Sequence, residues 1–301
     1  MSIGQIALSS SMRSNLSSLQ STASLLGATE ERLSSGKRVN SAVDNPANFF
    51  AAASHTSRAN QLTGLKDNIS EAIQTVKSAN SGIQGVLTTI EALRGVVTQA
   101  RSAINDTVNS AVTLGGAAAG GASGLTGQYN RLVEQLNNLV TDSSYKGTNF
   151  LTSGSVTLTV NFNENATTKI VMSGFNSGAS GLAISGGGST MTVAGATGNI
   201  TSGDLGTASS LDATEASLNT AIATLQTKAS ELAANLSSLT ARQTFITDMT
   251  NTLTVGATKL TEADTNEEGA NLLALQTRQS LGTSALSISS QANNSILKLL
   301  P

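Results

Sequence analysis

Apolar residues recur at helical spacing along most of the chain. In the first segment they share one helical face, at Leu8, Met12, Leu16, Leu19, Ala23, Leu26 and Leu33. The pattern predicts an amphipathic helix that ends near Gly36. The segment from 37 to 56 then reads as a connector, because Pro46 interrupts helix and biases Asn45 toward extended geometry.

The longest apolar seam starts at Leu62 and continues to Ile104, with spacings that alternate between three and four residues. A seam sustained in this way predicts a helix over 57–104, about 70 Å long. A helix of that length with one apolar stripe needs partners along its whole length. A second stripe over 213–260 is its expected partner, and a shorter helix over 125–143 is expected beside them.

The apolar period changes in the middle of the chain. Val156, Leu158 and Val160 alternate with polar residues, and an apolar run over 169–172 follows a turn-like segment, which predicts a β-hairpin. Residues 173–209 are rich in Gly, Ser and Thr, so we expect a surface lobe that contributes little burial. Asp212 and Glu215 have the spacing of a capping box, which predicts that helix resumes there.

The last segment keeps a helical rhythm. Its main apolar row includes Ala270, Ala274, Leu281, Ala285, Ile288, Ala292, Ile296 and Leu299, and a second row includes Leu272, Leu275 and Leu286. Residues 1–12 and 279–297 carry no charge. Apolar segments of this kind are poorly satisfied in a monomer and better satisfied in an assembly. We therefore expect both ends to be loose in a free subunit and to become ordered on association.

The predicted fold class is mainly α. A long antiparallel helical bundle or coiled coil forms from the N- and C-terminal segments, with a small β-rich insertion in the middle. The composition agrees with long, thin packing, because aromatic residues are only 3% of the chain and the apolar content is Leu, Ile, Val and Ala.

Charge and cysteine content exclude several function classes. A net charge of -2 gives no reason to expect a nucleic-acid or anionic-membrane partner. The absence of Cys excludes disulfides and thiolate metal sites. No window is long and apolar enough for a membrane span, and the first residues lack the pattern of a secretory signal.

Candidate catalytic chemistry is sparse. His55 is the only histidine, and nothing near it suggests an orienting acid or a nucleophile. Glu262, Asp264, Glu267 and Glu268 lack the spacing of a calcium-binding loop, which favours a solvated helix face or a polar contact between subunits. The sequence therefore predicts no enzyme, no cofactor and no metal site.

Several runs in the chain resemble bacterial flagellin. They are residues 33–47 (L-S-S-G-K-R-V-N-S-A-V-D-N-P-A), 65–82 (L-K-D-N-I-S-E-A-I-Q-T-V-K-S-A-N-S-G), 145–151 (Y-K-G-T-N-F-L), 274–286 (A-L-Q-T-R-Q-S-L-G-T-S-A-L) and 294–300 (N-S-I-L-K-L-L). The resemblance covers about 1–150 and 211–301. Two departures are the apolar Phe49 and Phe50, where the family has a small, polar run, and the final Pro301.

The resemblance implies a domain plan. Terminal helices 1–36 and 261–301 would form an inner tubular layer, and 57–172 with 211–260 would form an outer helical layer that carries the hairpin. Residues 173–210 would be a variable surface lobe. The connector over 37–56 would contain Gly36, Asn40, Asp44 and Pro46. The expected assembly interface comprises Leu8, Met12, Leu16, Leu19, Leu26, Leu33, Leu281, Leu286, Ile288, Ile296 and Leu299.

The resemblance also implies function and partners. The chain would be a structural subunit that polymerises with copies of itself into an extracellular flagellar filament for swimming. Its other partners would be the flagellar export apparatus, an export chaperone, the filament cap and hook–filament junction proteins. It would be exported without a cleaved signal peptide.

Two other classes share part of this pattern. A hook–filament junction protein has the same terminal architecture, and it is the alternative reading of the sequence. Some flagellins carry a protease in the middle, but the insertion here is short and a single His excludes the H-E-x-x-H motif.

A further resemblance concerns detection by a host. Many flagellins are bound by a Toll-like receptor through a helical run similar to L-Q-R-V-R-E-L. The run here is Ile90-Glu-Ala-Leu-Arg-Gly-Val96. It keeps Arg94 and ends in Val96, but Glu91 stands at the glutamine, Ala92 at the first arginine and Gly95 at the glutamate.

Overall fold

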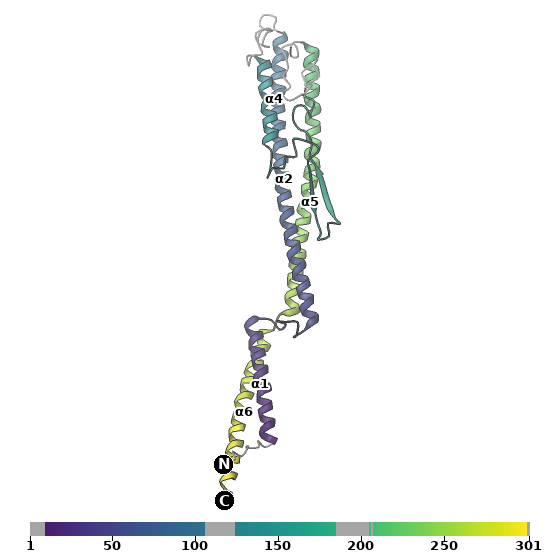
Figure 1. The fold of residues 1–301 in the computed structure, drawn as a ribbon. Coiled ribbons are helices and arrows are strands. Elements are labelled where there is room, and N and C mark those ends of the chain that lie inside the picture. Colours follow the sequence, from purple (N-terminus) through teal and green to yellow (C-terminus); the bar gives the residue numbers. More distant parts are fainter. Residues whose placement is uncertain (1–9, 106–123, 185–204, 206, 300–301) are drawn as a thin grey trace, which may run out of the picture. The chain divides into compact units, whose positions relative to one another are not determined.

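The computed structural model describes residues 10–105, 124–184, 205 and 207–299. Its elements in chain order are α1 (Ser10–Ser35), α2 (Pro46–Asn105), α4 (Leu125–Asp142), β1 (Thr157–Asn161), β2 (Lys169–Ser173), α5 (Ala208–Thr261) and α6 (Thr265–Leu299) (Figure 1). The predicted mainly α fold with a small β insertion is confirmed.

The chain divides into two compact units. We call Met1–Asn60 with Met249–Pro301 the terminal unit, and Gln61–Asp248 the central unit. The two long helices α2 and α5 each contribute one stretch to both units. None of the helices in the described residues is long and apolar enough to cross a membrane.

In the central unit, α2 and α5 pair through the apolar seams that the sequence predicts. On α2 the most deeply buried positions are Ile69, Val76, Ile83, Val86, Ile90, Leu93 and Ala100, all at 0% exposure, and on α5 they include Leu211, Leu218, Leu225 and Leu239. Gln243 donates to Ser70 Oγ at 2.7 Å, and Arg101 donates to Asp212 at 2.6 Å. The stretches from 70 to 101 and from 212 to 243 have equal length, so the helices run antiparallel in register.

The shorter helix α4 and the hairpin complete the central unit. Leu125, Tyr129, Val133, Leu136 and Val140 of α4 are buried. Strands β1 and β2 pair antiparallel, with Thr157 opposite Ser173 and Asn161 opposite Lys169. Beyond β1, the guanidinium of Arg242 on α5 lies 5.1 Å from the centre of the Phe162 ring, a cation–π contact. The predicted hairpin is confirmed.

The surface-lobe expectation is wrong for residues 174–184. Leu182 and Ile184 are buried, and Ser177 is fully covered, with its hydroxyl donating to Leu151 O at 3.1 Å. Ala179 N donates to Asn137 Oδ1 of α4 at 3.0 Å. This Gly- and Ser-rich segment packs because small residues allow close approach, which a count of apolar residues does not reveal. Residues 185–204 and 206 of the expected lobe lie outside the described residues.

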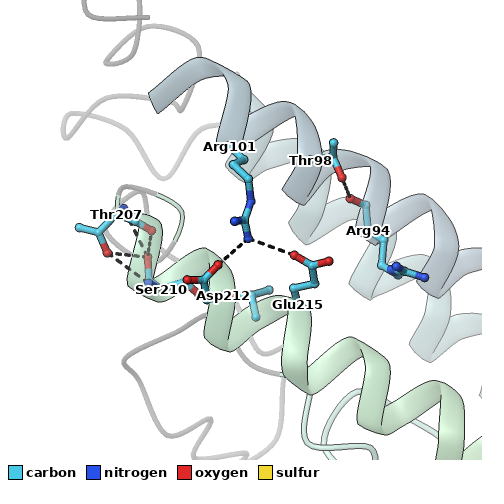
Figure 2. A network of polar contacts seen from close by, with 8 residues as sticks. Arg94, Thr98, Arg101, Thr207, Ser210, Asp212 and Glu215 are labelled. Atoms are coloured by element: carbon cyan, nitrogen blue, oxygen red, sulfur yellow. Dashed lines mark hydrogen bonds and ion pairs between the residues drawn. The ribbon is translucent and has the colours of Figure 1, made fainter. Parts of the chain in front are cut away.

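The predicted start of α5 at Asp212 is also wrong, because α5 begins at Ala208. Thr207 caps it instead: Ser210 N donates to Thr207 Oγ1, and Thr207 N donates to Ser210 Oγ, each at 3.3 Å. Asp212 and Glu215 lie inside the helix and both accept from Arg101 Nη2, at 2.6 and 3.0 Å (Figure 2).

Candidate functional site

Helices α1 and α6 pair in the terminal unit. The more covered face of α1 is the row Met12, Asn15, Leu19, Thr22, Leu26, Thr29 and Leu33, and that of α6 is the row Glu268, Leu272, Leu275, Gln279, Gly282 and Leu286. Leu19 lies against Gly282, and Arg32 near the end of α1 meets Glu268 near the start of α6. The two helices are therefore antiparallel.

The pairing gives this part of the terminal unit little protected core. Of the described α1 side chains, only Thr29 is buried, and on α6 only Glu268 and Leu275 are. Polar residues occupy Asn15, Thr22 and Gln279 of the two rows. A groove of about 450 Å³ also runs between the helices, lined by Met12, Leu16, Thr283, Leu286, Ser287 and Ser290.

The other side of α6 carries exposed apolar side chains. Leu273 and Leu281 are each 66% exposed, and Ile288 is 67% exposed. We call these three residues the α6 stripe. Leu281 and Ile288 belong to the main apolar row of this segment, whereas Leu272, Leu275 and Leu286 of the second row pack toward α1. The α6 stripe thus has no cover within the described residues.

Exposed apolar side chains concentrate in the terminal unit. Of the ten large hydrophobic side chains exposed among the described residues, eight belong to this unit: Leu16, Leu25, Val43, Phe50, Val255, Leu273, Leu281 and Ile288. The other two, Val171 and Phe245, belong to the central unit. Because apolar surface of this kind marks interaction sites, the terminal unit is the candidate assembly site.

The predicted interface residues have different environments. Met12, Leu19, Leu26, Leu33 and Leu286 are half-buried in the α1–α6 pair, whereas Leu16 is 39% exposed. Leu8 lies outside the described residues. Ile296 and Leu299 belong to α6, but their side chains lie outside what the structure describes.

The connector follows α1 in the chain, and backbone hydrogen bonds link it to the end of α5. Gly36 has φ +66°, a left-handed conformation that glycine adopts readily at a helix C-terminus. Thr261 O accepts from Arg38 N at 2.7 Å and from Val39 N at 3.2 Å, and Gly36 O accepts from Ala263 N at 3.0 Å. Val39 is buried beside these bonds. The two breaks in the helices therefore share one set of backbone hydrogen bonds.

Asp44 closes the loop that follows. Its Oδ2 accepts from the backbone N–H groups of Asn40 at 3.0 Å and Ser41 at 2.9 Å, and from the Ser41 hydroxyl at 3.1 Å. These bonds, chiefly the one from the Ser41 backbone, hold the pKa of Asp44 below its ordinary value. The loop is thus held by a charged carboxylate.

The connector is shorter than the sequence suggests. Helix α2 begins at Pro46, so the stretch 46–56 expected in the connector is helical, and His55 lies on this helix. Asn45 Oδ1 accepts from Asn48 N at 3.0 Å and caps the helix. Pro46 starts α2 because its fixed φ suits the first helical position, where no backbone donor is needed.

The acidic group at 262–268 is split by the fold. Glu262, Asp264 and Glu267 are exposed, and Asp264 Oδ1 caps α6 by accepting from Asn266 N at 2.9 Å. The expectation of a solvated face is wrong for Glu268, which is only 7% exposed and pairs with Arg32. Within the described residues, no cluster of His, Asp and Glu is arranged to hold a metal ion.

The receptor-like run lies on α2 in the central unit. Glu91, Ala92, Arg94 and Gly95 are exposed, whereas Val96 is buried at 6% exposure. The fold therefore presents four of these five residues to solvent.

Long helices from both ends of the chain, with exposed apolar side chains concentrated in the terminal unit, are typical of a structural subunit. The chain matches two protein-family models. The bacterial flagellin N-terminal helical region matches residues 5–157, and the bacterial flagellin C-terminal helical region matches residues 216–300. The chain belongs to the bacterial flagellin family, which supplies structural subunits of flagellar filaments.

Full-length relatives agree with this assignment. The chain is 27% identical to "Flagellin FljO" of Caulobacter vibrioides over 299 residues, or 99% of each protein. It is 26% identical to "Flagellin FljK" of the same organism over 284 residues, 94% of each. It is also 26% identical to a "Flagellin" of Brucella melitensis, with 99% of each chain covered. The resemblance seen in the sequence is confirmed.

Proposed function

We propose that this chain polymerises with copies of itself through its terminal unit into an extracellular flagellar filament that drives swimming. The observation that carries the proposal is the α6 stripe, with side chains about two-thirds exposed on a helix that already uses its other face against α1. A second copy that covers these side chains supplies the burial that one copy lacks.

The energetics favour repeated contacts. Fully burying one Leu or Ile side chain contributes about 1.5–3 kcal/mol, so covering an α6-stripe residue contributes on the order of 1–2 kcal/mol. No single contact of this size holds two subunits together, because association itself costs about 4–15 kcal/mol. A filament repeats the contact along every subunit, which is how small apolar gains sum to a stable polymer.

The domain plan follows from the same proposal. Residues 1–36 and 261–301 form the inner layer, and 57–172 with 211–260 form the outer layer. The export apparatus, an export chaperone at α6, the filament cap and junction proteins are its further partners. Matches at both flagellin terminal regions favour the filament subunit over the hook–filament junction protein.

The direct test replaces the α6 stripe. A Leu281→Ser and Ile288→Ser double variant should keep the helical circular dichroism of the unmodified monomer but form no filaments after addition of salt, as seen by electron microscopy. The matched control is Val171→Ser, which removes one apolar side chain with 53% exposure from β2 and should polymerise normally. Normal filaments from the double variant would contradict the proposal.

A second test of the proposed function removes both terminal segments of the chain. A chain trimmed to residues 37–261 should remain a folded, helical and soluble monomer that does not polymerise. If the trimmed chain still forms filaments, the terminal helices are not the assembly device.

A further inference from the structure

Two apolar side chains protrude from the connector and the start of α2. Val43 is 91% exposed and Phe50 is 63% exposed. We call these two residues the connector hydrophobes. Val43 belongs to the loop between α1 and α2 and Phe50 to the first turns of α2, so neither residue lies on α6. They are therefore separate from the α6 stripe.

The local structure holds the connector hydrophobes outward. The Phe49 ring, which is half-buried, packs edge to face against Phe50, with ring centroids 5.6 Å apart and an interplanar angle of 81°. The Asp44 hydrogen bonds fix the loop that carries Val43, and the Asn45 cap fixes the first turn before Phe50. A contact made here orders little that is not already ordered, which lowers its entropic cost.

The surroundings suit an apolar contact. From Pro46 to Ser57 the chain carries no charged Asp, Glu, Lys or Arg. Ala47, Ala53 and Ser54, which are exposed like Phe50, are small. Charged residues are depleted and aromatic residues enriched at the centres of protein interfaces, and this surface has the same composition.

The small apolar area of the connector hydrophobes indicates which kind of partner covers them. A Phe side chain buries about 150–250 Å² in full, so Phe50 and Val43 together offer far less than the ~800 Å² per partner of a stable complex. A separate soluble partner would not be held by so small a surface. A second copy of this chain that is already held by other filament contacts can use so small an apolar area, because this contact does not have to hold the copy by itself.

We propose that the connector hydrophobes contact a second copy of this chain within the filament, as an interface distinct from that of the α6 stripe. The inference rests on the proposed self-assembly. It adds a second apolar contact per subunit, at the joint where the α1 and α5 ends share backbone hydrogen bonds.

Because the chain has no Cys, single-cysteine variants give a clean test. Phe50→Cys and Val43→Cys should react quickly with a maleimide reagent in the monomer, and at least about tenfold more slowly in the filament, as expected for side chains that become buried at an interface. Val171→Cys measures how far filament formation alone slows the reagent. The proposal requires a larger slowing at 50 and 43 than at 171, and equal slowing at all three positions would overturn it.

A second measurement guards against loss of assembly in the variants. Phe50→Ser should raise the lowest concentration that supports filament growth by about tenfold or more, with unchanged circular dichroism of the monomer. If Phe50→Ser leaves this lowest concentration unchanged, the proposed contact of the connector hydrophobes is wrong, while the proposed function still stands. Failure of the unmodified chain and of Val171→Cys to polymerise would overturn both.

Discussion

Arg32 and Glu268 connect the last turns of α1 to the first turns of α6, with Nη1 of the arginine 3.5 Å from Oε1 of the glutamate. The glutamate side chain is only 9% exposed, and its Oε2 is buried with no hydrogen-bond partner among the described residues. A covered carboxylate with one unsatisfied oxygen depends on its counter-charge. Arg32 supplies the counter-charge for this covered carboxylate, at the point where α1 and α6 meet.

Removing the arginine should loosen the α1–α6 pair more than neutralising the acid. Arg32→Gln leaves a covered charge without its partner and should cost about 1–3 kcal/mol, whereas Glu268→Gln removes the charge itself and should cost less. Hydrogen exchange of the α1 and α6 amides reports the difference. Lys228→Gln breaks an exposed ion pair with Glu231 on α5 and is the control, with an expected effect below about 1 kcal/mol. Equal effects of Arg32→Gln and Lys228→Gln would show that the covered pair has no special role.

The connector loop should depend on pH through Asp44. Its pKa in the folded chain is below the ordinary value of 3.8 because the charged form accepts hydrogen bonds from Ser41 and Asn40. A lowered pKa means that the stabilisation is complete above about pH 4 and is lost as the pH falls through the folded value. The Asn40 and Ser41 amides should then exchange faster, after correction for the intrinsic pH dependence of exchange.

Asp44→Asn should reproduce the acid state at neutral pH. The variant amides at 40 and 41 should exchange faster than in the unmodified chain and show no further change below pH 4. Glu30→Gln, on an exposed position of α1, removes one negative charge elsewhere and should leave these two amides unaffected. A pH response that persists in Asp44→Asn would assign the effect to another group.

The sequence predicts the buried helix faces of the central unit better than those of the terminal unit. The reason is the composition of the residue rows through which the helices pack. On α2 nearly every seam position is apolar, so Ile69, Val76 and Ile83 identify the buried face without ambiguity. On α6 two apolar rows compete, and the row that packs on α1 contains Gln279 and Gly282. Helical periodicity does not rank two such faces, because the choice depends on the partner helix.

Local hydrogen bonding explains the other differences. The spacing of Asp212 and Glu215 fits a capping box, but Thr207 and Ser210 form the actual cap one turn earlier. Pro46 reads as a helix breaker, although it begins α2. The Asp212–Glu215 spacing and Pro46 can each stand at a helix start or elsewhere relative to a helix. The conformation of the neighbouring backbone determines which of these occurs. Phe50 stands out in the sequence as an apolar departure from the family's small, polar run, whereas Arg32 and Val43 carry no such signal.

The segment 174–184 should be required for the stability of the central unit, unlike the segment that follows it. Ile184→Ala removes a side chain with 1% exposure and should cost about 2–5 kcal/mol, as expected for a large-to-small change in a core. Urea denaturation followed by circular dichroism measures this. Replacing 185–204 by a Gly–Ser linker should leave both stability and polymerisation unchanged. A large loss of stability from the linker would show that those residues pack as well.

The final prediction concerns host detection by the Toll-like receptor that binds many flagellins. The fold presents Ala92, Arg94 and Gly95 on the exposed side of α2, while Leu93 and Val96 are buried in the central unit. The residues available to a receptor are thus Arg94, Ala92 in place of the first arginine, and Gly95 in place of the acid, together with Glu91 at the glutamine position. Truncating an arginine at the centre of an interface often costs about 2 kcal/mol or more, roughly thirtyfold in affinity. A glycine within the helix also costs about 1 kcal/mol of helix propensity.

We therefore expect the unmodified monomer to be a weak activator in a receptor reporter-cell assay. The double variant Ala92→Arg and Gly95→Glu should raise its potency by about tenfold or more, because it restores both side chains on an exposed and already helical surface. Ala223→Arg, at an exposed position of α5, is the matched control for added positive charge and should not raise potency. Full potency of the unmodified chain would contradict the prediction. An equal gain from Ala223→Arg would show that net charge, rather than this run, controls the response.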